Sequence, residues 1–232
     1  MMRLVRYLLS ALLILPAAAF AQFEGTLILE PTGCEAAGKC TVKDKFRFID
    51  RNGLVWEAQA GLQTDGASIP TVFQPIIGAP FDPSYVKAAV IHDQYCWHKV
   101  RPWRETHRVF YEALIAQGVA LGTAKTMYFA VYLGGPKWLK LVPGTHCGQG
   151  CINSITGMDG KPVLRSRAAE YDRPEVKAEA QRLAAELEKN PNAQTLEQLE
   201  ARAQVLRPND YYYRNGAEVV VTNISQVPLA TQ

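Results

Sequence analysis

Three consecutive helical segments joined by short connections constrain the fold of this chain more than any other feature. The pattern of apolar residues predicts helices from about Pro83 or Ser84 to His98, from about Trp103 to Gln117, and from Thr123 to Leu133. Pro102 marks the break after the first helix, and Gly134-Gly135-Pro136 ends the third. Helices with such short connectors pack as neighbours, so we expect at least the first two to be antiparallel.

The residues before these helices predict a small antiparallel sheet. Segments 23–30, 45–50 and 54–58 alternate between apolar and polar side chains and favour strands. Asn52-Gly53 lies between the last two segments and is typical of a hairpin turn. The expected fold is therefore α+β, with a small antiparallel N-terminal sheet packed on a three-helix core.

The composition changes beyond residue 160. Segments 173–189 and 194–206 are rich in Ala, Glu, Leu and Gln and predict an amphipathic helical hairpin. We interpret this hairpin as a solvated appendage, with a partner-binding arm as the alternative. Residues 217–223 are a strand candidate, which we expect to return to the N-terminal sheet. The expected organisation is a signal peptide (1–21), a core domain with a His-Asp motif (22–160), and a helical C-terminal extension with a terminal strand (161–232).

The first residues have the three-part pattern of a secretory signal. Arg3 and Arg6 precede an apolar run over 8–15 and a small-residue cleavage region, so we expect cleavage after Ala21 and export to the periplasm or the exterior. The run is shorter than the roughly 20 residues of a membrane span, and we expect no transmembrane span after cleavage. Cleavage lowers the formal net charge from +3 to +1, and the remaining Lys and Arg are scattered, which argues against a nucleic-acid partner.

Five cysteines in an exported chain suggest disulfide bonds. Cys34 and Cys40 could close one local loop, and Cys147 and Cys151 another. Pairing of a cysteine from one pair with a cysteine from the other is the alternative. Cys96 is then left over, and its position in a helix favours a small buried apolar side chain over a reactive thiol.

A His-Asp pair in the first helical segment is the main candidate for chemistry. Adjacent residues on a helix diverge by about 100°, so His92 and Asp93 should have separate roles: His92 as a general base on water and Asp93 facing a cation. His107 shares the face of the second helix that turns toward the first and could orient the imidazole. Asp65 is the nearest further carboxylate in the sequence. The predicted catalytic residues are His92, Asp93, Asp65 and His107.

Three alternatives use the same stretch of chain. Ser68 could act as a nucleophile, although its surroundings differ from the G-x-S-x-G elbow. Zinc bound by His92, His107 and Asp65 is chemically sensible. The third alternative is a satisfied buried polar network that fixes the loop over 64–70 and performs no reaction.

The chain has the motifs T-D-G-A-S-I-P at 64–70, A-x-x-H-D at 89–93 and M-Y-x-A-V at 127–131. Together they resemble the domain-of-unknown-function 1353 family of phages and bacteria. The resemblance extends over about Phe46 to Trp138. The family's second helix has the form R-x-A-D-x-x-F, whereas this chain has Thr106-His107 at the Ala-Asp position. If that acidic residue orients the histidine or holds a metal in relatives, its replacement here weakens a catalytic role or changes the metal preference.

The segment 88–96 is similar, more distantly, to the helix C-C-x-x-H-D-x-C-Y of secreted calcium-dependent phospholipases, without the paired cysteines. That similarity implies that His92 is the base and Asp93 a calcium ligand. The expected function is an exported hydrolase that uses a His-Asp centre on lipid or cell-envelope substrates, with a divalent cation, calcium or zinc, as a candidate cofactor. The alternative is a non-catalytic envelope or phage-derived structural or binding module.

Overall fold

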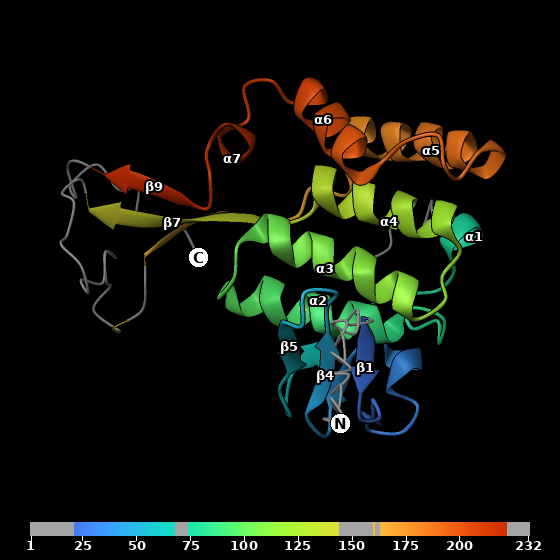
Figure 1. Ribbon diagram of the computed structural model, residues 1–232. Coiled ribbons are helices and arrows are strands. Elements are labelled where there is room, and N and C mark those ends of the chain that lie inside the picture. The colour runs from blue at the N-terminus through green and yellow to red at the C-terminus, as the bar shows by residue number, and fades with distance from the viewer. Residues whose placement is uncertain (1–20, 68–73, 144–159, 161–162, 222–232) are drawn as a thin grey trace, which may run out of the picture.

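The computed structural model describes residues 21–67, 74–143, 160 and 163–221 (Figure 1). The expected signal sequence before Ala21, the alternative nucleophile Ser68 and the proposed Cys147–Cys151 pair lie outside these residues. Figure 1 shows helices stacked in successive layers above the N-terminal strands, with a separate strand pair extending to one side. Mixed α+β structure is confirmed.

The described helices are, in chain order, α1 (Gln74–Ile77), α2 (Val86–His98), α3 (Trp103–Ala116), α4 (Leu121–Gly134), α5 (Pro174–Lys189), α6 (Leu196–Leu206) and α7 (Tyr211–Arg214). The three central helices predicted from the sequence are α2, α3 and α4. Helix α3 packs between α2 and α4. Its buried side chains, which include Thr106, His107, Phe110 and Leu114, recur at helical spacing.

Two small antiparallel sheets precede the helices. One has the order β1 (Gln22–Glu24), β4 (Phe46–Ile49), β5 (Val55–Ala58), and the other β2 (Leu29–Glu30), β3 (Cys40–Val42), β6 (Gln63–Thr64). Helix α2 lies against β4 and β5.

The predicted hairpin through Asn52-Gly53 joins β4 to β5. The Asp50 carboxylate accepts hydrogen bonds from the backbone N–H groups of Asn52 and Leu54 and from the Trp56 indole. Gly53 has a positive φ of 79°, a conformation that glycine adopts without strain. The turn is therefore held by one buried carboxylate.

A third sheet was not predicted in this form. Strand β7 (Lys137–Pro143) pairs antiparallel with β8 (Leu164–Arg167) and parallel with β9 (Glu218–Val221). The expectation that the last strand returns to the N-terminal sheet is therefore wrong. A parallel pair needs a long crossover connection, and α5, α6 and α7 lie between β7 and β9 in the chain.

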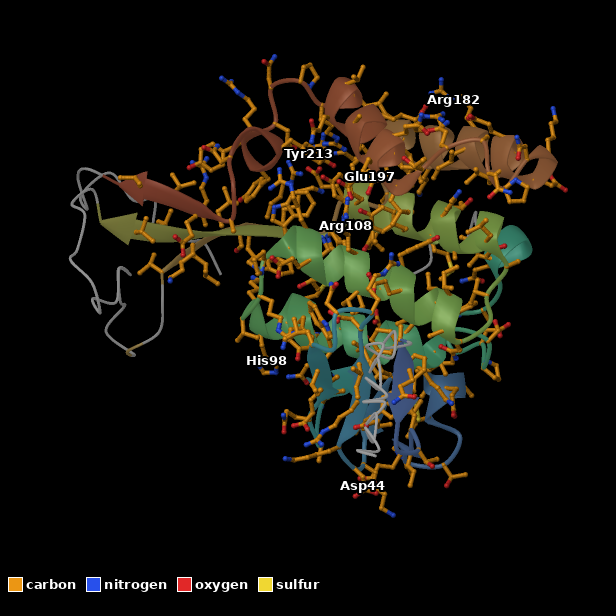
Figure 2. All side chains as sticks on the ribbon, in the orientation of Figure 1. Asp44, His98, Arg108, Arg182, Glu197 and Tyr213 are labelled. Carbon is orange, nitrogen blue, oxygen red and sulfur yellow. A yellow bond between two sulfur atoms is a disulfide. The ribbon has the colours of Figure 1, made fainter. Side chains whose placement is uncertain are left out.

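The C-terminal helical hairpin packs on the core. Leu183 and Leu187 of α5 and Leu199 of α6 are fully buried, and both helices contact α4. Arg108 of α3 forms ion pairs with Glu197 and Glu200 of α6, and Figure 2 shows Arg108 beside Glu197 between the two helices. The interpretation of a solvated appendage is therefore wrong, because the sparse leucine stripe is enough to cover α4.

Cys34 and Cys40 form a disulfide across the short 3-10 helix η1 (Cys34–Ala37). This confirms the local pairing and excludes the alternative for these two cysteines. Cys96 is a free thiol and is partly buried. Within the described residues, every helix is too short or too polar to cross a bilayer.

Candidate functional site

His92 of α2 and His107 of α3 contact each other where the two helices meet. His92 Nε2 lies 2.8 Å from His107 Nδ1, and His107 Nε2 lies 3.1 Å from the carbonyl oxygen of Pro136. Because a carbonyl only accepts, His107 Nε2 must carry a proton and donate it. Neutral His107 then presents a lone pair at Nδ1, and His92 Nε2 donates to it. This network assigns one tautomer to each imidazole and leaves His92 Nδ1 as an acceptor.

Burial keeps both imidazoles neutral. It lowers the pKa of His92 to about 3. Burial also lowers the pKa of His107 well below its ordinary value, and the neighbouring His92 and the Lys137 ammonium add to this effect. The His92 ring packs against Phe110, with 4.7 Å between the ring centroids. The pair is therefore a neutral hydrogen-bonding unit at neutral pH.

Cys96 completes a cluster with the two histidines. It follows His92 by four residues on α2, so both side chains lie on one face of the helix. Its Sγ is 3.4 Å from His92 Nε2. One nitrogen from each of His92 and His107 and the sulfur of Cys96 all lie within 4.8 Å of one another. Burial raises the pKa of the Cys96 thiol well above its ordinary value, and Asp93 adds to this rise.

Asp93, the residue after His92, is hydrogen-bonded to the last residue of strand β6. Its Oδ2 accepts a 2.6 Å hydrogen bond from the Thr64 hydroxyl, and Thr64 Oγ1 accepts from the backbone N–H of Gly66. Burial raises the pKa of Asp93 well above its ordinary value; the Thr64 hydrogen bond opposes this rise, whereas nearby Asp65 adds to it. Asp93 therefore fixes the loop and also carries an unusually basic carboxylate.

A cavity of about 870 Å³ opens beside these groups. Its polar lining includes Thr64, Asp65, His92, Asp93 and Cys96, which we call the polar wall. Much of the remaining lining is apolar and includes Ala67, Ile77, Met127, Val131 and Val176. Trp97 also lines the cavity while its side chain is 72% exposed, so it stands at the mouth. The polar wall is therefore reachable from a space large enough for a small organic ligand.

Tyr171 contributes to the cavity from the segment before α5. Burial raises the pKa of its phenol well above the ordinary value, and the charges of Cys96, Asp93 and Asp65 add to the rise. Tyr171 could not be found from the sequence, because nothing local connects it with residues far earlier in the chain.

The structure places the four residues that the sequence singled out in two groups that share His92. His92 and His107 are in contact, and His92, Asp93 and Asp65 line one cavity. Their catalytic roles remain predictions. The sequence suggested zinc ligands from His92, His107 and Asp65. In the structure, the third side chain close to the two histidines is Cys96 and not Asp65. The sequence did carry a sign of this grouping, because His92 and Cys96 are four residues apart on one helix.

Cys34, Glu35 and Cys40 are also close together, but the two sulfurs are bonded to each other.

Residues 40–131 match the model of a family described as "Protein of unknown function (DUF1353)". This confirms the resemblance, and the matched segment contains His92, Asp93, Cys96 and His107.

Two relatives come from Sinorhizobium fredii. The chain is 48% identical to the uncharacterized protein y4iH over 120 residues, which cover 51% of this chain and 50% of that protein. It is 43% identical to the uncharacterized protein y4jT over 125 residues, 52% of this chain and 37% of that protein. The chain therefore spans half or less of the length of these curated relatives. No solved structure shows significant similarity to it.

Proposed function

We propose that this protein is an exported hydrolase that cleaves ester or amide bonds in lipid or cell-envelope molecules. The observation that carries the proposal is that the 870 Å³ cavity has His92 and Asp93 in its wall. Export, expected from the N-terminal residues, would give the protein access to such substrates.

Hydrolysis requires a group that accepts a proton from the attacking water. His92 and Asp93 are proton acceptors at the same wall, and each is held by a second side chain: His92 by His107, and Asp93 by Thr64. Such fixed orientation lowers the entropic cost of reaching the transition state.

The remaining lining suggests the kind of substrate. Ile77, Met127, Val131 and Val176 offer apolar surface to an acyl chain or a similar group, and Tyr171 offers a phenol hydroxyl near the two carboxylates. A mostly apolar cavity with a few polar groups at one wall is typical of sites for small molecules. The reacting bond would lie at the polar wall and the apolar part of the substrate against the others.

An activity panel with matched variants tests the proposal. The purified protein is incubated with phospholipids, acyl esters and peptidoglycan fragments, and products are quantified. We expect cleavage of one class, and a loss of kcat/KM of about a hundredfold or more in His92→Ala and Asp93→Asn. His98→Ala is the control, because His98 is exposed at the end of α2 (Figure 2). Absence of cleavage across the panel, or full activity in both variants, would reject the proposal.

One observation favours a second candidate, a non-catalytic structural module. The hydrogen bonds from Thr64 to Asp93 and from Gly66 to Thr64, and the chain from His92 through His107 to Pro136, form the satisfied polar network that a structural role requires. Under this candidate, His92→Ala and Asp93→Asn lower the melting temperature strongly and there is no activity to lose.

A further inference from the structure

We propose that His92, Cys96 and His107 form a binding site for a transition metal, with zinc as the best-suited ion and an open coordination position toward the cavity. The three side chains belong to the site of the proposed hydrolase. The binding itself does not depend on that function; only the catalytic use of the metal does.

Two of the distances between the donor atoms are close to those of a tetrahedral site, and all three donor atoms lie within 4.8 Å of one another. Zinc lies about 2.0–2.1 Å from imidazole nitrogen and about 2.3 Å from thiolate sulfur, so two nitrogens should be about 3.3 Å apart and nitrogen and sulfur about 3.6 Å apart. Cys96 Sγ is already 3.4 Å from His92 Nε2. The 2.8 Å between His92 Nε2 and His107 Nδ1 is about half an ångström shorter than in such a site, so the two rings must move slightly apart when a metal binds.

His107 is already oriented as a ligand. Its Nε2–H donates to the Pro136 carbonyl, so the lone pair at Nδ1 points into the cluster. A hydrogen bond from the second ring nitrogen to a carbonyl or carboxylate is the usual support of a metal-binding histidine. Gly135 makes room for this ring, since a Cβ there would lie 3.2 Å from His107 Cε1 and 2.3 Å from the Val131 carbonyl oxygen.

The donor atoms select the class of metal. Two imidazoles and one thiolate suit zinc and similar late transition metals, whereas calcium and magnesium require oxygen ligands. Binding changes the protonation of two side chains. His92 transfers the proton of Nε2 to Nδ1 by exchange with solvent and so frees Nε2, while Cys96 loses its thiol proton to solvent. One proton is released in total, and the divalent metal with one thiolate leaves a site of charge +1 close to the Asp93 carboxylate.

Three protein ligands with a fourth position open to a cavity are the arrangement of catalytic zinc sites. His92 and Cys96 line the cavity directly. A metal held there supplies Lewis acidity at the polar wall. Asp93 is outside the ligand group and lines the same cavity.

Cobalt titration tests the site without any substrate. The full-length purified protein is stripped with a chelator and titrated with Co²⁺ under reducing conditions that leave the Cys34–Cys40 disulfide intact. We expect one tightly bound ion per chain, with a thiolate-to-cobalt charge-transfer band and the visible spectrum of tetrahedral Co²⁺. Cys96→Ser should remove the charge-transfer band, and both Cys96→Ser and His107→Ala should weaken binding by about a hundredfold or more. His98→Ala should bind as the unchanged protein does.

Melting temperatures separate loss of the site from loss of the fold. In chelator, Cys96→Ser should melt close to the unchanged protein, and Zn²⁺ should raise the melting temperature of the unchanged protein but not of the variant. Absence of tight binding, or binding that is unchanged in both Cys96→Ser and His107→Ala, overturns the inference. Metal binding without hydrolysis would reject only the proposed function, and hydrolysis by a metal-free protein that does not bind Co²⁺ would reject only the metal site.

Discussion

The Thr64 hydroxyl donates a 2.6 Å hydrogen bond to Oδ2 of Asp93 and so ties the end of strand β6 to helix α2. The same oxygen accepts from the Gly66 backbone N–H, which directs its proton to Asp93. A single buried hydroxyl therefore connects the loop that begins at Asp65 with the helix that carries His92.

Replacing Thr64 by valine tests this connection. Thr64→Val keeps the shape of the side chain but removes both hydrogen bonds, so the Asp93 carboxylate loses the hydroxyl that donates to it. We expect the free energy of unfolding to fall by about 1–3 kcal/mol, measured by urea denaturation. Thr41→Val on neighbouring β3 is the control and should change the free energy of unfolding by less than about 0.5 kcal/mol. Equal effects of the two substitutions would contradict this account.

The buried histidines make stability depend on pH in the acidic range. The pKa of folded His92 is about 3, against about 6.5 for an unfolded histidine, so the unfolded chain binds more protons between these values. His92 alone should therefore lower the free energy of unfolding by about 2 kcal/mol when the pH is lowered from 7 to 5.

The measurement is urea denaturation at pH 7, 6 and 5, in chelator so that no metal contributes. His92→Gln should lack this part of the pH dependence, whereas His98→Gln, at an exposed position, should retain it. The same acid loss in all three proteins would show that His92 is not the group responsible.

Lys137 makes stability depend on pH in the alkaline range. It is fully buried, and its ammonium donates to the carbonyl oxygens of Leu133 and Gly135. Burial lowers its pKa to about 7, and the Arg167 charge adds to this effect. Because an unfolded lysine has a pKa near 10.4, unfolding takes up a proton between these values. The free energy of unfolding should rise by about 2 kcal/mol from pH 7 to pH 9.

Lys137→Met should remove this rise, since methionine fills a similar volume without a titrating group. Urea denaturation at pH 7, 8 and 9 provides the comparison. A variant whose stability rises as steeply as that of the unchanged protein would refute the assignment to Lys137.

The packing of α6 on the core predicts a large effect of a single leucine. Leu199 is completely buried, whereas Leu206 at the end of the same helix is 44% exposed. Leu199→Ala should lower the free energy of unfolding by about 2–5 kcal/mol, and Leu206→Ala by much less. Thermal or urea unfolding measures both. Similar small losses in the two variants would mean that the hairpin contributes little to the core.

The parts of the fold that sequence alone predicted are those encoded by nearby residues. The hairpin through Asn52-Gly53 and the Cys34–Cys40 pair need only local turn and loop geometry, and α2, α3 and α4 need only helical spacing with Gly and Pro at their ends. Strand β7 was missed because its partners, β8 and β9, lie far along the chain. No local sequence pattern predicts which of several strands β7 pairs with.

The candidate site also has parts that nearby residues predict and parts that depend on distant ones. His92 and His107 could be matched from helix faces, since connected neighbouring helices were expected to pack together. Tyr171 and Pro136 could not, because they reach the cluster through the path of the chain after α4. Cys96 lies on the same face of α2 as His92, but a lone thiol in a helix is more often part of a core. Only its short distances to both histidines indicate a possible role in the site.

The cavity is lined by residues from inside and from outside the segment that matches the family. His92, Asp93 and Cys96 lie inside that segment, whereas Ser166, Tyr171 and Val176 line the cavity from beyond it. Ser166 and Val176 have no part in the proposed chemistry, so substitutions there should change which compounds fit without removing a reactive side chain. The selectivity of the proposed hydrolase can therefore be altered at positions outside the family segment, such as Ser166 and Val176.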